Sequence, residues 1–321
     1  MAQNAAVSER TVAVLAGGLS HEREVSLRSG RRLAAALRHV GLDVREWDMD
    51  ASLIERLRTD PPDAVAIALH GGEGENGSVQ AVLELLGVPF VGTPAPACRR
   101  AWDKPTAKAE LARAGLGTPD WVALPHTTFR ALGAQAVLDA MVDRLGLPLM
   151  LKPDQGGSAL GAQVVRERID LPAAMVSCLA YGDTVLAERF VVGTEVAVSV
   201  VEDGGEPRAL PAVEVDAAGG FYDYTARYTP GAAVFHCPAR LDVTVLADLE
   251  EAALAAHRLL GLRDVSRMDA VVDADGRVQV LEVNVSPGLT DTSLLPIAAR
   301  ASGIDLGALY AALVERAVAR S

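Results

Sequence analysis

The chain has 321 residues, of which 50% are hydrophobic and 22% are charged, a balance typical of a packed globular protein rather than a disordered one. Its length predicts two or three domains. The formal net charge of −12, with no basic run, argues against a nucleic acid as partner. We find neither a signal-peptide pattern nor an apolar run of about 18 residues, so we expect a cytoplasmic protein that does not bind a membrane. The three cysteines are far apart and predict reduced thiols rather than a zinc site or disulfides.

The first part of the chain predicts a parallel αβ domain over residues 11–94, preceded by a flexible tail at 1–10. Apolar segments bounded by glycine alternate with helical segments, which is typical of a parallel sheet covered on both faces. The prolines at 94 and 96 mark its end. The predicted strands are 11–18, 64–72 and 88–92, and the predicted helices are 24–40 and 78–86.

The remaining sequence predicts two further domains, at residues 95–187 and 188–321. The middle domain mixes helices with strands and contains a glycine-rich loop, DQGGSALG, at 154–161. The last domain is rich in strands and closes with a helical tail. Further predicted helices are 104–114, 128–145 and 243–260, and further predicted strands are 121–124, 147–153, 184–190, 195–202, 210–216, 265–273 and 277–284.

The last two strands predict a hairpin that brings carboxylates together. Asp-Gly favours a two-residue hairpin loop, which places Ala274 opposite Arg277. This register puts Asp269 opposite Glu282 and Arg267 opposite Asn284, with all four side chains on one face. On that face, Arg267 therefore pairs with Asn284, and Asp269 pairs with Glu282.

Two carboxylates directly opposite each other repel, so the pairing favours a bound divalent cation. Hard oxygen ligands, two carboxylates and an amide, suit magnesium better than zinc. The alternative is a solvated strand face with scattered charges. A three-residue loop with a bulge would also shift the register and break the pairing.

Two lysines are candidates for binding phosphate. Lys152 ends an apolar strand directly before the glycine-rich loop, where backbone N–H groups can approach phosphate oxygens. The loop does not match the P-loop pattern, and it could be a simple turn. Lys104 begins a helix and could equally be a surface lysine. Glu188 and Glu195 flank the apolar linker FVVG, which could contact a purine ring and ribose hydroxyls.

The segment AGGLSHEREVSL follows the first strand and begins a helix, as a nucleotide-binding turn does. It is not GxGxxG, and it carries Glu22 and Glu24 at the helix start. Carboxylates there would repel a pyrophosphate, so the segment suits a cationic group such as a substrate ammonium. The alternative is that Glu22 only complements the helix dipole.

Seven segments in order make the sequence similar to the D-alanine–D-alanine ligases of the ATP-grasp superfamily. They are AGGLSHEREVSL, ALHGGEGENG, DKPTAK, LKPDQGGSALG, FYDYTARY, RMDA and LEVNVSPGLTDTSLLP, between about residues 11 and 317. The resemblance implies an α/β (α+β) chain, with a parallel N-terminal domain and a two-part ATP-grasp fold that holds ATP between two sheets. It also implies that ATP phosphorylates one D-alanine, that a second D-alanine attacks the acyl phosphate, and that the product serves peptidoglycan synthesis.

The resemblance also implies roles for individual residues. Two Mg²⁺ or Mn²⁺ ions would be held by Asp269, Glu282 and Asn284. ATP would contact Lys104, Lys152, Gly157, Ser158, Glu188, Phe190, Val191, Glu195 and Arg227. The D-alanine substrates would contact Glu22, His70, Arg267, Gly288, Ser293 and Leu294, and the catalytic set would be Glu22, Ser158, Tyr228, Arg267 and Ser293. Residues 219–230 would form a lid, and a homodimer is expected for this family.

Three departures from the family pattern concern the rate and the acceptor. Arg227 stands where the family usually has lysine, and Thr292 stands where it often has histidine. The loop reads DQGGSALG where SREGSSVG is usual. The presence of Tyr228 favours an amine acceptor.

The sequence leaves three alternative functions open. One is a ligase for another D-amino acid or hydroxy acid. The others are an NAD-dependent oxidoreductase, which the absent GxGxxG argues against, and a non-catalytic nucleotide-binding module.

Overall fold

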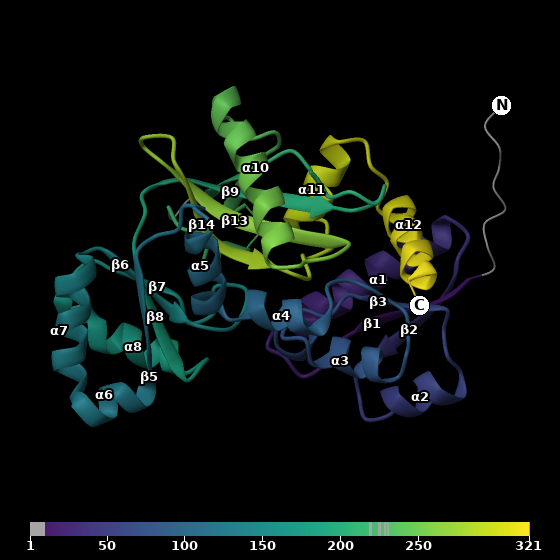
Figure 1. Ribbon diagram of the computed structural model, residues 1–321, viewed down its shortest axis with the longest axis horizontal. Coiled ribbons are helices and arrows are strands. Elements are labelled where there is room, and N and C mark those ends of the chain that lie inside the picture. The colour runs from purple at the N-terminus through teal and green to yellow at the C-terminus, as the bar shows by residue number, and fades with distance from the viewer. Residues whose placement is uncertain (1–9, 218–219, 224–225, 228, 230, 321) are drawn as a thin grey trace.

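The computed structural model describes residues 10–217, 220–223, 226, 227, 229 and 231–320, and arranges them around three sheets (Figure 1). One sheet is parallel and two are antiparallel. The N-terminal elements occupy one end of the molecule in Figure 1, the middle elements the other end, and the largest sheet lies above and between them. The predicted α/β class with one parallel sheet is confirmed.

The N-terminal sheet has four parallel strands in the order β2-β1-β3-β4. Its central strands are almost fully buried because helices cover both faces, which explains their continuous apolar sequence. The edge strand β2 was not predicted, since its sequence DVREWD carries charges that point to solvent. The elements are β1 (Thr11–Ala16), α1 (Arg23–His39), β2 (Asp43–Asp48), α2 (Leu53–Thr59), β3 (Ala64–Ile67), the 3₁₀ helix η1 (Gly72–Gly74), α3 (Ser78–Leu85) and β4 (Phe90–Val91).

The middle sheet has four antiparallel strands in the order β5-β8-β6-β7. Helices α7 and α8 bury their apolar residues against it. The single helix predicted for 128–145 is wrong: the chain breaks at Gly133, whose φ of +90° a helix cannot contain. The elements are α4 (Ala95–Trp102), α5 (Lys104–Arg113), β5 (Trp121–Pro125), α6 (His126–Leu132), α7 (Ala134–Leu145), β6 (Leu149–Pro153), β7 (Gln163–Val165), the 3₁₀ helix η2 (Arg168–Asp170), α8 (Leu171–Leu179) and β8 (Thr184–Arg189).

The largest sheet runs β12-β11-β9-β13-β14, with β10 paired to β9. Helix α10 packs on this sheet together with α4 and α5, although the latter two precede the middle sheet in the chain. The domain boundaries at 94 and 187 stay predictions. The elements are β9 (Gly193–Val201), β10 (Arg208–Ala209), β11 (Val213–Ala217), β12 (Ala233–His236), α10 (Val243–Leu259), β13 (Val265–Asp273), β14 (Val278–Asn284), α11 (Leu294–Ala301) and α12 (Leu306–Ala319).

The β13–β14 hairpin has the predicted pairing near the site and a different turn. Asp269 lies opposite Glu282, as expected. The predicted two-residue loop is wrong, because Asp273 rather than Ala274 faces Arg277, so the loop has one extra residue. A bulge beside Asp269 adds a residue to β14 and cancels this shift. Two irregularities that compensate therefore bring the carboxylates opposite each other.

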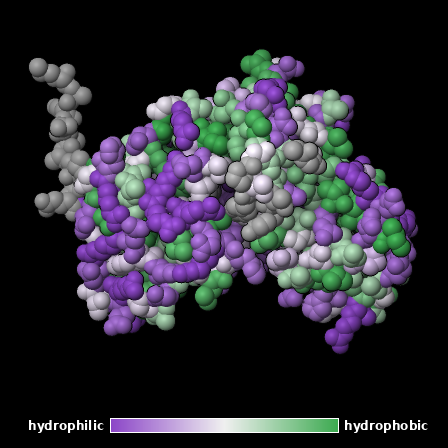
Figure 2. All heavy atoms as spheres, turned by 180° about the vertical axis from the view of Figure 1, so that it is seen from behind, coloured by the Kyte–Doolittle hydropathy of each residue, from purple (hydrophilic) through white to green (hydrophobic). Residues whose placement is uncertain are grey.

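The last two helices connect the largest sheet to the N-terminal unit. Helix α12 packs on α1, β3 and β4, and α11 packs on β9 and β11. Within the described part of the chain, no single helix is long and apolar enough to cross a membrane. Among the described helices, the one neighbouring pair that is long and apolar enough when taken together is α11 and α12, and this pair is bent by 103°. From behind, the surface is hollowed between the N-terminal and middle units, and the N-terminal side is mainly hydrophilic (Figure 2).

Candidate active site

Two cavities meet between the three sheets. One, called the substrate cavity here, lies between the N-terminal unit and the end of β14. The other, called the nucleotide cavity here, lies between the middle sheet and the largest sheet and has a volume of about 330 Å³. Seven of the described residues line both cavities and mark the junction, among them Lys104, Gly157, Arg227 and Glu282. A molecule in one cavity can therefore reach a molecule in the other.

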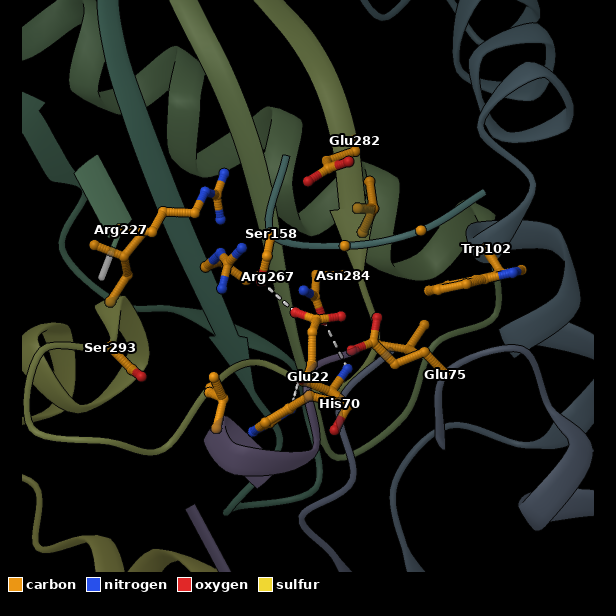
Figure 3. A pocket seen from close by; sticks show the side chains of 18 of the residues that line it. Glu22, His70, Glu75, Trp102, Ser158, Arg227, Arg267, Glu282, Asn284 and Ser293 are labelled. Atoms are coloured by element: carbon orange, nitrogen blue, oxygen red, sulfur yellow. Dashed lines mark hydrogen bonds between the residues drawn. The ribbon is translucent and has the colours of Figure 1, made fainter. Parts of the chain in front are cut away.

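Glu22 and Ser158 come together in the substrate cavity although they are 136 residues apart (Figure 3). Glu22 stands directly before α1, and Ser158 lies in the glycine-rich loop, where it has a φ of 53°. The Ser158 hydroxyl donates a short hydrogen bond to the Glu22 carboxylate. Burial raises the pKa of Glu22, and this hydrogen bond opposes the rise. The carboxylate is thus available to a cationic group inside the cavity.

Glu75 is a second carboxyl group in this cavity, and it was not predicted. It follows η1 and accepts a hydrogen bond from the Gly71 N–H at 2.9 Å. Burial, together with the charge of nearby Glu22, raises the pKa of Glu75 to about 8. The motif HGGEGENG contains both Glu73 and Glu75, and the sequence did not indicate that Glu75 is buried while Glu73 is exposed.

His70 lines the same cavity and is held from both sides. Its Nδ1 lies 3.2 Å from the Ser286 carbonyl and its Nε2 lies 2.8 Å from the Ser29 hydroxyl. A carbonyl oxygen can only accept, so Nδ1 carries the proton and Nε2 accepts from Ser29. Burial lowers the pKa of His70 to about 4, which makes the ring neutral near pH 7. His70 therefore fixes the chain after β14 against α1.

The hairpin carries the predicted face of charged groups. Arg267 makes a two-pronged ion pair with Asp269, through Nε at 2.6 Å and an Nη at 2.7 Å. Burial alone would raise the pKa of Glu282, but the cations around it, Lys104 foremost, lower that pKa to about 2. Glu282 is therefore ionised, and with Asn284 it points into the cavity from β14 (Figure 3).

The three side chains predicted to bind metal fit a hard divalent cation by their chemistry. Asp269 and Glu282 supply carboxylate oxygens, and Asn284 supplies an amide oxygen. Among the described residues there is no group of three or more His, Cys, Asp or Glu side chains that could hold a metal ion. Two carboxylates and one amide leave coordination positions for other oxygens, and those of a nucleotide phosphate would fill them.

The predicted phosphate-binding lysines lie at the nucleotide cavity. The Lys104 ammonium donates to the Gly156 carbonyl at 2.7 Å and lies 3.4 Å from the Glu282 carboxylate. Lys152 pairs with Glu188 at 2.8 Å. The cavity wall includes every residue predicted to contact ATP except Ser158, which lines the substrate cavity: Lys104, Lys152, Gly157, Glu188, Phe190, Val191, Glu195 and Arg227.

The chain after β14 forms another wall of the substrate cavity. The Ser293 hydroxyl accepts from the Thr290 N–H at 3.0 Å, and the two hydroxyls lie 2.8 Å apart. A Cβ at Gly288 would lie 2.7 Å from the Ser293 oxygen, so a side chain there would force this segment to shift. Gly288, Ser293 and Leu294 line the cavity together, as predicted.

The predicted lid is described only in part, and Tyr228 lies outside the described residues. Beside it, the Arg227 guanidinium stacks on the Tyr222 ring at 4.6 Å, and its Nε donates to the Tyr222 carbonyl at 3.2 Å. The Tyr222 N–H in turn donates to Glu195 at 3.2 Å. These contacts connect the segment after β11 to the wall of the nucleotide cavity. Tyr222 lies within the predicted lid segment and lines both cavities, whereas Trp102, which lines the substrate cavity, was not predicted.

Comparisons with known proteins agree with this geometry. Residues 111–315 match the family model described as D-ala D-ala ligase C-terminus. A D-alanine–D-alanine ligase of Moorella thermoacetica is 40% identical over 307 residues, which cover 96% of this chain and 99% of the relative. The crystal structure of such a ligase from Bacillus anthracis complexed with ATP has a TM-score of 0.80 at 27% identity, covering 97% of this chain and 98% of that one. The crystal structure of the VanG D-Ala:D-Ser ligase of Enterococcus faecalis has a TM-score of 0.81 at 25% identity, covering 97% of this chain and 100% of that one. The chain therefore belongs to the D-alanine–D-alanine ligase family.

Proposed function

We propose that this chain uses ATP to join two D-alanine molecules into D-alanyl-D-alanine, with release of ADP and phosphate, for peptidoglycan synthesis. The observation that carries the proposal is the junction of the two cavities at Lys104, Gly157, Arg227 and Glu282. A terminal phosphate in the nucleotide cavity can meet a carboxylate in the substrate cavity at this point. The reaction requires the terminal phosphate and the carboxylate to come into contact, because a carboxylate anion is a poor electrophile until it is phosphorylated.

The proposed chemistry has two steps. A carboxylate oxygen of the first D-alanine attacks the terminal phosphorus of ATP, the bond from that phosphorus to the bridging oxygen breaks, and ADP leaves. The amine of the second D-alanine then attacks the carbonyl carbon of the acyl phosphate. The tetrahedral intermediate collapses as its carbon–oxygen bond to phosphate breaks, and the nitrogen loses a proton. Acyl phosphates hydrolyse, so the cavity must also exclude water.

The substrate cavity supplies groups for both amino acids. Glu22, held by Ser158, would bind the ammonium of the first D-alanine. Arg267 would face the oxyanion of the tetrahedral intermediate, where a fixed positive charge stabilises the transition state most. His70 would keep the wall in place because both of its ring nitrogens are already bonded. The second D-alanine would lie against Gly288, Ser293 and Leu294, and Tyr228 would complete the catalytic set.

The nucleotide cavity would hold ATP with its adenine against the linker between β8 and β9. Phe190 and Val191 provide the apolar surface there, and Glu195, which lines the same cavity, would hold ribose hydroxyls. The triphosphate would run toward the junction. Its contacts would be Lys104, Lys152, Gly157, Ser158 and Arg227, with Glu188 holding Lys152.

Two Mg²⁺ or Mn²⁺ ions would be bound by Asp269, Glu282 and Asn284. When bound, they would neutralise charge on the phosphates during transfer. The chain's own contribution is to keep Glu282 ionised and to hold Asp269 in place through Arg267. The presence of both carboxylates and the amide argues against a non-catalytic module.

The acceptor is tested by offering D-alanine, L-alanine, D-serine and D-lactate, first each as the sole substrate and then each of the last three in competition with D-alanine. With ATP and Mg²⁺, D-alanine alone should release phosphate and form dipeptide in equal amounts. The D-serine arm matters because the D-Ala:D-Ser ligase from Enterococcus faecalis shares the fold at 25% identity. A product containing D-serine or D-lactate in the larger amount, when each competes with D-alanine, would support the alternative acceptor. No phosphate release with any of them would contradict the ligase.

A homodimer and a cytoplasmic location stay proposals. ATP is a cytoplasmic substrate, and the thiols Cys98 and Cys178 are free and buried, which supports a reducing compartment. Sedimentation at micromolar concentration would measure the oligomeric state, and a monomer would contradict the dimer.

A further inference from the structure

Lysine is rare in this chain, and its few lysines gather at one place. The sequence contains 27 arginines and only three lysines, Lys104, Lys108 and Lys152. Lys104 and Lys152 line the nucleotide cavity. Lys108, one helical turn after Lys104 on α5, lies behind the cavity wall with only 1% of its side chain exposed. A chain that uses arginine almost everywhere else therefore keeps a compact ammonium at this buried position.

Lys108 and Lys152 hold the two oxygens of one carboxylate. The Lys108 ammonium lies 2.8 Å from Oε1 of Glu188, and the Lys152 ammonium lies 2.8 Å from Oε2. Only 2% of the Glu188 side chain is exposed, whereas 12% of the Lys152 side chain is exposed, toward the cavity. Glu188 thus forms one ion pair with a lysine behind the wall and another with a lysine in the wall.

Lys108 is itself fixed by the strand beside it. Its ammonium donates to the Thr118 hydroxyl at 2.5 Å, and that hydroxyl donates to the Val280 carbonyl of β14 at 2.8 Å. An ammonium suits this buried position, while a planar guanidinium would need more room and different acceptor positions. Burial lowers the pKa of Lys108, and the neighbouring Glu188 carboxylate opposes that effect. Burial would likewise raise the pKa of Glu188, but the two flanking lysines hold it below its ordinary value.

A buried carboxylate needs a positive partner. With Lys108 present, Glu188 has a positive partner that no ligand can reach, so Lys152 does not have to neutralise the Glu188 carboxylate alone. Without Lys108, the whole charge of Glu188 would act on Lys152. The Lys152 ammonium would then be drawn toward the wall and away from a phosphate in the cavity.

We propose that Lys108 is a positioning residue for nucleotide binding: by balancing Glu188 from behind, it leaves Lys152 free to contact an ATP phosphate. The inference rests on the proposed use of ATP. Lys108 lines neither the substrate cavity nor the nucleotide cavity, so it acts on a nucleotide only through Glu188 and Lys152. Loss of Lys108 should therefore change the affinity for nucleotide and leave D-alanine binding in the other cavity unchanged.

The test compares Lys108→Met with Arg320→Met as a matched control. Arg320 also pairs with a fully buried carboxylate, Asp264 at 2.8 Å, and lies in neither cavity. In Lys108→Met, the KM for ATP and the Kd for ADP with Mg²⁺, measured by calorimetry, should both rise on the order of tenfold, the scale of one charge-assisted contact. The KM for D-alanine and kcat should change less than about twofold, because uniform binding is lost rather than transition-state stabilisation. Arg320→Met should lower the Tm and leave both nucleotide constants unchanged.

A second readout follows Lys152 directly. Protein labelled with ¹³C at the lysine ε-carbon gives three signals, which single Lys→Arg variants assign. Lys108→Met should shift the Lys152 signal without nucleotide and reduce its further shift on adding ADP, and Arg320→Met should do neither. Thr118→Val loosens Lys108 without removing charge and should raise the Kd for ADP about threefold, which keeps the test usable if Lys108→Met does not fold.

The outcomes separate the two proposals. If Lys108→Met binds ADP as well as the wild-type chain does, the role of Lys108 is refuted and the ligase proposal stands. Where Lys108→Met does not fold, the same conclusion follows if Thr118→Val binds ADP as well as the wild-type chain does. An equal loss of nucleotide affinity in Arg320→Met also refutes that role, because it would show a general effect of destabilisation. If the wild-type chain binds neither ATP nor ADP, both proposals fall.

Discussion

Replacing Glu75 by glutamine should change how the stability of the ligand-free protein depends on pH. Glu75 is buried in the substrate cavity close to Glu22, and its pKa is raised from 4.5 to about 8. The folded protein therefore keeps this proton up to about pH 8, whereas the unfolded chain loses it near pH 4.5. Glutamine keeps the side-chain shape and the acceptor for the Gly71 N–H, but it cannot ionise.

The size of the effect follows from the raised pKa. Because the folded state binds the extra proton, the stability that Glu75 contributes is complete below pH 4.5 and is lost as the pH rises toward 8. At 1.36 kcal/mol for each pKa unit, the loss between pH 5 and pH 8 is about 3 kcal/mol. Glu22 adds a change of the same sign, since burial raises its pKa as well.

Urea unfolding of wild-type and Glu75→Gln protein at pH 5, 6, 7 and 8 measures this directly. The free energy of unfolding of the variant, relative to wild type, should rise with pH by about 3 kcal/mol over that range. Subtracting the wild-type free energy of unfolding from that of the variant removes the pH dependence of every titratable group that the substitution does not affect. Parallel curves for the two proteins would refute the reasoning and would mean that Glu75 is already ionised in the folded chain.

Two further predictions concern the junction and the first substrate. Glu282→Gln should abolish ADP formation while circular dichroism and Tm stay close to wild type, because β14 keeps its pairing with β13; turnover near the wild-type rate would contradict the metal assignment. Ser158→Ala should raise the KM for D-alanine about tenfold and move the pH at which D-alanine binds upward, because the hydrogen bond that opposes the rise in the pKa of Glu22 is lost. An unchanged pH profile would separate Ser158 from Glu22.

Much of the fold could be predicted from periodicity, and the exceptions have physical causes. The buried strands β1 and β3 carry almost continuous apolar residues, so their patterns were clear. The edge strand β2 was missed because it carries Asp43, Arg45 and Glu46, which interrupt the apolar pattern, and because Asp43 and Glu46 are exposed. The break between α6 and α7 depends on the backbone of Gly133, which helix periodicity does not report.

The described residues that family motifs predicted for the site line the two cavities, and their roles stay predictions, whereas residues that only burial marks out were missed. The pairing of Asp269 with Glu282 was predicted from a hairpin loop of the wrong length, and a bulge restored the register. That agreement depended on the extra loop residue and on the bulge, and the alternation of side chains along a strand predicts neither of them. Glu75 and Lys108 were missed because charged residues are usually exposed, and nothing in their spacing indicates burial.

The most direct test of the central claim follows an oxygen atom. The wild-type chain is incubated with ATP, Mg²⁺ and D-alanine labelled with ¹⁸O in its carboxylate, and the released phosphate is analysed by mass spectrometry. If a carboxylate oxygen attacks the terminal phosphorus and stays with it when the peptide bond forms, each phosphate should carry one ¹⁸O atom. Phosphate without the label would mean that water cleaves ATP, and it would contradict the acyl phosphate route.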